Sequence, residues 1–159
     1  MKRKNRDMEL TVTNSNSRRA FWIYLVAIIV SLIGLGDSIY LTAEHLAGRT
    51  IRCTVIRGCS EVLGSSYAKI AGIPTASFGI LAYFTVFSLA TLALFGYRGA
   101  WKSLSLLVAA MFLATLWFVY LQAFVLHAFC QFCLLSAGTT TILLLLVLVK
   151  RYLVKDLAH

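Results

Sequence analysis

Apolar residues occur along this chain in long blocks that are separated by polar segments. Residues 20–43 contain Asp37 as their only charge, and residues 73–97 contain no charge. Because the hydrocarbon core of a bilayer is about 30 Å thick, a helix needs roughly 20 apolar residues to cross it. Each of these two blocks therefore predicts one transmembrane helix.

A third uncharged run, from Ser103 to Val149, is too long for one helix. At about 1.5 Å per residue it would form a helix of roughly 70 Å, more than twice the thickness of the membrane core. We therefore expect two helices, over residues 103–126 and 130–150, with a turn at the midpoint of the run.

The polar segments complete the predicted architecture. Residues 1–19 are basic and lack apolar periodicity, which predicts a flexible cytoplasmic tail. Residues 44–72 form one long loop, in which Ser60 could cap a short helix lying along the membrane interface. Residues 20–152 are thus expected to form an all-α integral membrane domain, a four-transmembrane-helix bundle with an extracytoplasmic loop and a half-helix lid.

Composition and charge support this class of protein. The chain is 60% hydrophobic and only 13% charged, so a soluble domain would expose far too much apolar surface. Its net charge of +9 would indicate nucleic-acid binding only if the basic residues clustered on one soluble face. They flank the apolar blocks instead, so we expect a lipid bilayer around the protein and no nucleic-acid partner.

The positions of Lys and Arg predict the orientation. The long loop contains four of them, and all the others lie in the two tails or in the 98–102 turn. Cytoplasmic segments carry the excess of positive charge, so both termini are expected in the cytoplasm and the loop and the 126–130 turn outside. A bacterial inner membrane is the expected location, with the endoplasmic reticulum membrane as the alternative. Asp37 is either a functional acid inside the membrane or an interfacial residue with ordinary partners.

Four cysteines are the candidate chemistry. Cys53 and Cys59 lie in the long loop, whereas Cys130 and Cys133 form a CxxC motif at the start of the fourth span. The predicted topology places all four on the same side of the membrane. They could form structural disulfides, bind zinc, or exchange electrons as two pairs.

The spacing favours electron exchange. A CxxC closes a small, strained ring that is easily reduced, whereas structural disulfides usually close longer loops. The Cx5C spacing of the loop pair is unusual for zinc, and an oxidising compartment disfavours free thiolates. We therefore expect thiol–disulfide exchange and no metal.

The CxxC also suggests where the electrons go. Cys130 would open the fourth helix, where free backbone N–H groups stabilise a thiolate, and Cys133 would lie one turn deeper on the same face. The sequence contains no haem or nucleotide-binding motif, which leaves a membrane quinone as the acceptor. Six aromatic residues near the fourth helix either line a pocket for its ring or are ordinary transmembrane filling: Trp117, Phe118, Tyr120, Phe124, Phe129 and Phe132.

The order of these motifs resembles the vitamin K epoxide reductase family, most closely its bacterial branch. The matching positions are Cys53-x5-Cys59, residues 60–67 (SEVLGSSY), Gly72-Ile73-Pro74, Ser77-Phe78-Gly79, Tyr83 and Cys130-x-x-Cys133. The resemblance covers roughly Ser31 to Ala137. It implies a four-helix bundle around a quinone of the ubiquinone or menaquinone (vitamin K) type.

The resemblance also implies a role for each cysteine. Cys133 would face the quinone, Cys130 would exchange with Cys59, and Cys53 would meet a thioredoxin-fold partner. Electrons would flow from the partner to the quinone, which supports disulfide bond formation. Many bacterial members carry a fused thioredoxin-like domain, and this sequence shows none, so we expect a separate, DsbA-like partner protein.

Family pocket positions are matched by Ser65, Phe78 and Tyr83. Thr75 stands where vertebrate members have an Asn that contacts the vitamin K ring, and Ala137, beside Ser136, where they have a Tyr. These departures disfavour specific epoxide reduction. The alternatives are a quinone or epoxide reductase that runs in the reductive direction, and a non-catalytic tetraspan scaffold held by structural disulfides.

Overall fold

The computed structural model describes residues 2–48, 58–65, 68–70 and 72–156. Its elements are α1 (Lys2–Leu46), α2 (Cys59–Gly64), β1 (Lys69–Ile70), β2 (Ile73–Pro74), α3 (Thr75–Leu94), α4 (Arg98–Tyr120), the π-helix η2 (Leu121–Val125) and α5 (Gln131–Asp156). Four stretches are long and apolar enough to cross a membrane: Arg18–Leu46, Thr75–Leu94, Gly99–Val125 and Gln131–Tyr152. The predicted all-α bundle of four membrane-spanning helices is confirmed.

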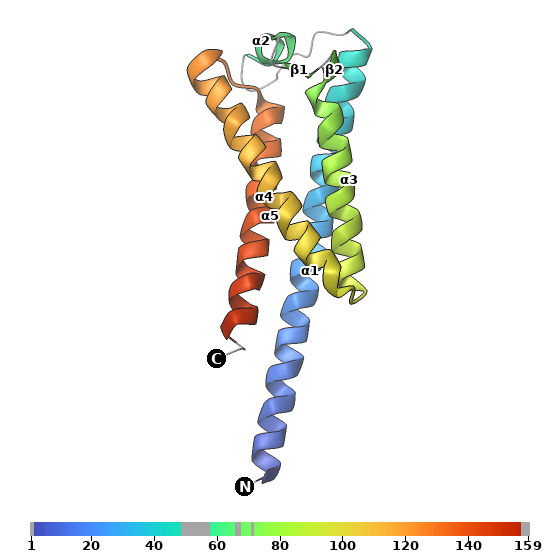
Figure 1. Ribbon diagram of the computed structural model, residues 1–159, viewed down its shortest axis with the longest axis vertical. Helices are drawn as coiled ribbons and strands as arrows, with labels where there is room; N and C mark the ends of the chain where they lie inside the picture. Colours follow the sequence, from blue (N-terminus) through green and yellow to red (C-terminus); the bar gives the residue numbers. More distant parts are fainter. Residues whose placement is uncertain (1, 49–57, 66–67, 71, 157–159) are drawn as a thin grey trace.

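Both termini lie at one end of the bundle, and α2 with the β1–β2 hairpin lies at the other, which we call the lid end (Figure 1). The two strands are antiparallel, with Lys69 opposite Pro74 and Ile70 opposite Ile73. Pro74 directly precedes α3, where its fixed backbone suits the start of a helix. The hairpin was not predicted, because two residues per strand are too few to give an alternating pattern.

The first helix is longer than the sequence predicted. Residues 2–19, expected to form an irregular tail, continue α1 as far as Lys2. The physical reason is that no Gly or Pro occurs before Gly34, so nothing in the sequence interrupts the helix at the membrane boundary. The cytoplasmic location of this segment stays a prediction.

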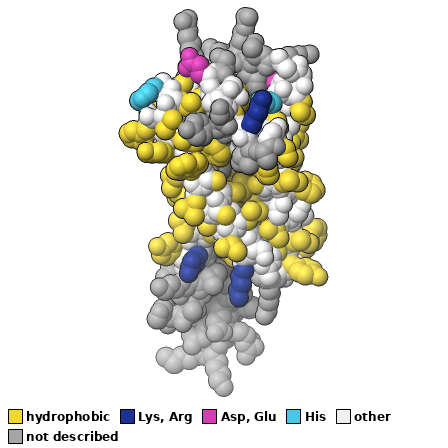
Figure 2. Space-filling model, turned by 45° about the horizontal axis from the view of Figure 1, so that its top comes forward, with side chains coloured by type: hydrophobic (Ala, Val, Ile, Leu, Met, Phe, Trp, Pro, Cys, Tyr) yellow, Lys and Arg dark blue, Asp and Glu magenta, His cyan; other side chains and the backbone are white. Residues whose placement is uncertain are grey.

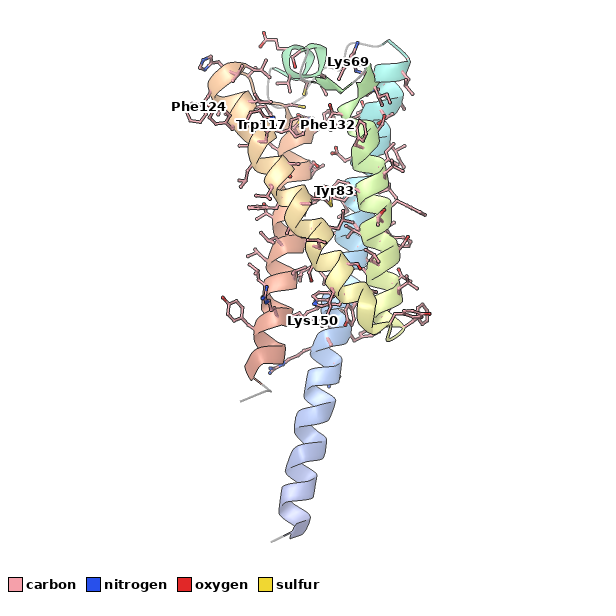
Figure 3. The ribbon with its side chains drawn as sticks, viewed as in Figure 1. Lys69, Tyr83, Trp117, Phe124, Phe132 and Lys150 are labelled. Atoms are coloured by element: carbon pink, nitrogen blue, oxygen red, sulfur yellow. The ribbon has the colours of Figure 1, made fainter. Side chains whose placement is uncertain are left out.

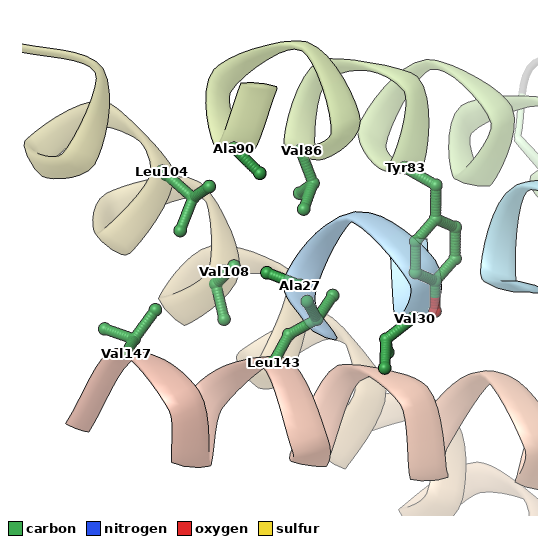
Figure 4. Close-up of a cluster of buried hydrophobic side chains, with 9 residues drawn as sticks. All are labelled: Ala27, Val30, Tyr83, Val86, Ala90, Leu104, Val108, Leu143 and Val147. Atoms are coloured by element: carbon green, nitrogen blue, oxygen red, sulfur yellow. The ribbon is translucent and has the colours of Figure 1, made fainter. Parts of the chain in front are cut away.

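The four long helices form a ring in which α1 and α4 each pack mainly against α3 and α5. All four contribute to one apolar core, made of Ala27, Val30, Tyr83, Val86, Ala90, Leu104, Val108, Leu143 and Val147 (Figure 4). Large apolar side chains also cover the outside of the bundle, and Lys and Arg side chains lie beyond this hydrophobic band (Figure 2). This is the surface expected of helices in contact with lipid.

Small residues let α1 and α3 approach closely. A Cβ on Gly34 would lie 2.4 Å from Cε1 of Tyr83, and a Cβ on Gly79 would lie 2.7 Å from Oγ of Ser38. Helices in a membrane associate by such close packing, because lipid removes the hydrophobic driving force between them. The absence of a side chain at Gly34 is therefore what seats the Tyr83 ring between the two helices.

Lys150 of α5 joins three helices at the end opposite the lid (Figure 3). Its ammonium group donates a hydrogen bond to the hydroxyl of Tyr24 on α1. The same group lies 4.0 Å from the centroid of the Tyr24 ring and 3.8 Å from the centroid of the Trp101 ring on α4. Cation–π contacts of this kind hold a positive charge among aromatic faces, so the lysine ties α1, α4 and α5 together.

Candidate functional site

Three of the four cysteines lie together at the lid end. Cys59 begins α2 and Cys130 immediately precedes α5, and both are buried in one apolar cluster with Leu41, Val62 and Ala128. Cys133 packs against this cluster and is half-buried. Cys59 is disulfide-bonded, whereas Cys130 and Cys133 are free thiols. Cys53 lies outside the described residues, so its place in the site stays a prediction.

Gly58 brings α2 close to the turn before Cys130. Its φ of 142° is a conformation that residues with a side chain rarely adopt. A Cβ there would also lie 2.9 Å from the carbonyl oxygen of Phe129 and 3.2 Å from Cβ of Ala128. The glycine therefore allows the start of α2, with Cys59, to rest directly on the segment that carries Cys130.

Gln122 fixes Cys130 from the other side. Its side chain is buried, and its Oε1 accepts a hydrogen bond of 2.9 Å from the backbone N–H of Cys130. The backbone oxygen of Gln122 accepts a second bond, of 3.2 Å, from the N–H of Ala128. Gln122 lies within η2, and π-helical turns are frequent at functional sites because they re-aim side chains. We did not identify Gln122 from the sequence, although a Gln inside a long apolar run is a signal.

The start of α5 then shapes the chemistry of the pair. The carbonyl of Cys130 accepts the hydrogen bond of the Leu134 N–H, at 3.0 Å, so Cys130 occupies the capping position of the helix. Its thiol lies near the free N–H groups of the first turn. This is the helix-terminal placement that the sequence predicted.

The pKa of Cys130 is lowered from 9.0 to about 7. The largest cause is a side-chain hydrogen bond from Cys133, and the backbone N–H groups of Cys133 and Phe132 add to it. Burial opposes the shift, and so does the carboxylate of Asp37. Because the thiolate is the reactive form of cysteine, this lowered pKa makes the reactive form of Cys130 more available near neutral pH.

A cavity of about 270 Å³ lies beside Cys133. All four long helices and α2 line it, and most of its surface is apolar. The five residues expected to contact a quinone ring all line this cavity together with Cys133: Ser65, Thr75, Phe78, Tyr83 and Ser136. Cys59 and Cys130 do not line it. The two cysteines of the CxxC therefore lie in different surroundings: Cys130 in the apolar cluster under α2, and Cys133 at the cavity.

The side chain of Tyr83 lines the cavity and reaches from α3 to α5 in the middle of the bundle (Figure 3). It lies 2.8 Å from Oγ of Ser136, 2.8 Å from Oγ1 of Thr139 and 3.0 Å from Oγ1 of Thr140. It also donates toward the carbonyl oxygen of Ser136, at 3.1 Å. A buried phenol needs such partners, and here they hold the ring at a fixed depth.

The prediction that aromatic residues line the pocket was wrong for five of the six residues named. Of the six aromatic side chains named from the sequence, only Phe118 lines the cavity. Trp117, Tyr120 and Phe124 stack on one another on the outside of α4 and η2, and Figure 3 shows Trp117 and Phe124 there. Phe132 packs on Tyr40, with ring centroids 5.3 Å apart. Aromatic content did not indicate which face of the helix each ring occupies.

Two titratable residues of α1 also line the cavity, Asp37 and His45. The sequence left the position of Asp37 open, and the structure places it inside, 8% exposed. Within the described residues, no group of three or more His, Cys, Asp or Glu side chains could hold a metal ion.

These features define an integral membrane protein with two free thiols, one buried and one half-buried, at the edge of an apolar cavity. The chain belongs to the vitamin K epoxide reductase family, whose model matches residues 25–148. The matched segment covers all four spans except the ends of the first and last. This is an oxidoreductase family, and membership indicates a quinone-linked redox function in the membrane.

A first prediction concerns Gly58. We expect Gly58→Ala to destabilise the seating of α2 by about 1–3 kcal/mol, because it adds both backbone strain and an overlap with Phe129. Gly64→Ala is the matched control, since nothing lies within 4 Å of a Cβ at that position. Thermal unfolding in detergent would measure the difference. Equal behaviour of the two variants would contradict this role of Gly58.

A second prediction concerns the protonation of Cys130. In the reduced protein its thiolate should be present above about pH 7 and be lost as the pH falls through that value, because the pKa is lowered. Cys133→Ala removes the largest cause and should raise the midpoint. Ultraviolet thiolate absorbance, taken as a difference from Cys130→Ser, follows the titration. A midpoint that stays the same in Cys133→Ala would exclude Cys133 as the stabilising donor.

Proposed function

We propose that this protein is a membrane thiol–disulfide oxidoreductase that passes electrons from an extracytoplasmic thioredoxin-fold protein to a membrane quinone. The electrons would enter at Cys53 and Cys59, move to Cys130 and Cys133, and leave to the quinone, which supports disulfide bond formation. The observation that carries the proposal is the divided surroundings of the CxxC. Cys130 packs with Cys59, whereas Cys133, hydrogen-bonded to Cys130, lines the cavity.

The cavity suits a quinone head group. Small-molecule pockets of roughly 300–1,000 Å³ are apolar with a few placed polar groups, and this cavity of about 270 Å³ lies near the lower bound. The proposed ring contacts are Ser65, Thr75, Phe78, Tyr83 and Ser136. When bound, a quinone of the ubiquinone or menaquinone type would supply a two-electron, two-proton acceptor beside Cys133.

The chain's own steps balance as thiol–disulfide exchange. The partner reduces the Cys53–Cys59 disulfide, and the Cys59 thiolate then attacks Cys130 within a Cys130–Cys133 disulfide. The bond between Cys130 and Cys133 breaks and a Cys59–Cys130 bond forms. Cys53 next attacks Cys59, which releases Cys130 as a thiolate. A thiol with a low pKa leaves more easily, so the lowered pKa of Cys130 favours this step.

Reconstitution in lipid vesicles tests the function. When the reduced wild-type protein is mixed with a soluble ubiquinone or menaquinone analogue, thiol trapping should show oxidation of Cys130 and Cys133. A reduced thioredoxin-fold protein should then become oxidised over many turnovers. If all four cysteines stay inert to both reagents, the protein is a non-catalytic scaffold. If electrons flow from the quinol to the thioredoxin-fold protein, the enzyme runs in the reductive direction.

The same experiment includes a test of the order of the cysteines. In Cys133→Ala the exchange should stop at a Cys59–Cys130 disulfide, which non-reducing peptide mass mapping detects. The matched variant Cys130→Ala should give little Cys59–Cys133 disulfide, because Cys133 faces the cavity. If Cys59–Cys133 were the product in both cases, the roles within the CxxC would be exchanged.

The same proposal orients the protein in a bacterial inner membrane, with both termini in the cytoplasm and the lid end outside. Support comes from the common end of the two termini and from the charge distribution of the sequence. Alkaline phosphatase fused after His159 should be inactive in cells, whereas alkaline phosphatase inserted in the 49–57 segment should be active. The reverse result would mean that the protein has the opposite orientation in the membrane.

A further inference from the structure

Asp37 is a buried acid without an evident structural task. It lies in the membrane-spanning part of α1, it is 8% exposed, and its Oδ2 has no hydrogen-bond partner within the described residues. It also lines the cavity that Cys133 lines. An acid in a membrane interior is costly, and a buried polar atom without a partner calls for an explanation.

The surroundings of Asp37 contain no described counterion. No Lys or Arg is among the residues that line the cavity, and the titratable groups that do line it are His45 on α1, Tyr83 on α3 and Cys133 on α5. The hydroxyl of Tyr83 is engaged by Ser136, Thr139 and Thr140. Neither α2 nor α4 contributes a titratable side chain to this surface. Asp37 therefore shares this cavity with the inner thiol of the CxxC.

The close approach of α1 and α3 comes from small residues on both helices. Gly34 and the Ser38–Gly79 contact provide the close approach of the two helices. When Asp37 is charged, it acts on the dithiol, because its charge opposes the thiolate of Cys130, against the larger effect of the Cys133 hydrogen bond. The acid and the CxxC are thus close enough for the charge on one to affect the other.

We propose that Asp37 is a catalytic residue that carries a proton between Cys133 and the quinone bound in the cavity, an inference that rests on the proposed function. When the dithiol closes, one S–S bond forms and two electrons pass to the ring. Asp37, protonated at the start, gives its proton to a ring oxygen, and the Cys133 S–H bond then breaks and its proton goes to Asp37. The ring needs a second proton, which it takes from water. This proton balances the one that Cys130 released to water when it became a thiolate. The carboxyl group ends in its starting state.

Proton transfer through a carboxyl group is more effective than direct transfer from the thiol to the ring. Transfer through a positioned acid or base accelerates a proton-coupled step by about 10²–10⁴-fold. A permanent unpaired charge would be expensive in an apolar cavity, whereas a proton carrier is charged only in passing. The polar atom left without a partner is then the atom that must stay available to the substrate.

The variants are Asp37→Asn, which keeps the shape but cannot carry a proton, and Asp37→Glu, which keeps the carboxyl group. Glu44→Gln is the matched control, since it removes an acid from the same helix outside the cavity lining. Each protein is reconstituted, reduced, and mixed rapidly with a short-chain quinone analogue. Thiol trapping then gives the rate of Cys130–Cys133 oxidation between pH 5 and pH 9, a range of roughly two units on each side of neutrality.

We expect Asp37→Asn to slow this oxidation at least about tenfold and to remove an inflection from its pH profile, with partial recovery in Asp37→Glu. Reduction of the Cys59 disulfide by a small dithiol should be unchanged in both. Infrared difference spectra on binding the analogue should show a carboxyl band in the wild type and in Glu44→Gln that is missing in Asp37→Asn.

Two failures are distinguishable. A wild-type dithiol that no quinone oxidises would overturn the proposed function itself. A wild type that is oxidised, together with an Asp37→Asn protein of the same rate, pH profile and infrared spectrum, would overturn only the role of Asp37. If Asp37→Asn does not fold, the pH profile of Asp37→Glu decides, because a proton carrier of altered length must change that profile and a purely structural residue must not.

Discussion

The arrangement of the site depends on the hydrogen bond between the side chain of Gln122 and the backbone N–H of Cys130. This bond sets where the chain turns back into the membrane, and so it sets which residues occupy the first turn of α5. With Cys130 at the capping position, the helical repeat carries Cys133 one turn inward and toward the bundle axis. A shift of one residue would move both thiols by about 100° around the helix and separate them from their present surroundings.

Two sets of contacts tie the helices together away from the lid end. Lys150 ties three helices together at one end, and the Tyr83 hydroxyl network fixes α3 against α5 in the middle. Above that level the cavity is lined by apolar side chains together with a few small polar ones, such as Ser38, Thr75 and Ser136. Stability and function are thus divided along the length of the same four helices.

Much of the fold could be predicted because the apolar blocks are bounded by charge and their lengths give the number of spans, and hydropathy reports both directly. The site was predictable only in part. The spacing of Cys130 and Cys133 indicated two depths on one helix face, whereas the cavity contacts, such as Phe78 and Tyr83, came from family resemblance. The π-helix, the positive φ of His127 and the inward position of Gln122 could not be predicted, because they arise from tertiary contacts that no local pattern records.

The outward stack of Trp117, Tyr120 and Phe124 has a consequence for the protein's behaviour in different membranes. Amphipathic rings partition to the headgroup level and hold a helix at that depth even when bilayer thickness varies. The stack ends only a few residues before the turn that carries Cys130. Variation in lipid length would then be absorbed at the opposite end of the bundle, while the distance from the dithiol to the aqueous boundary stays constant.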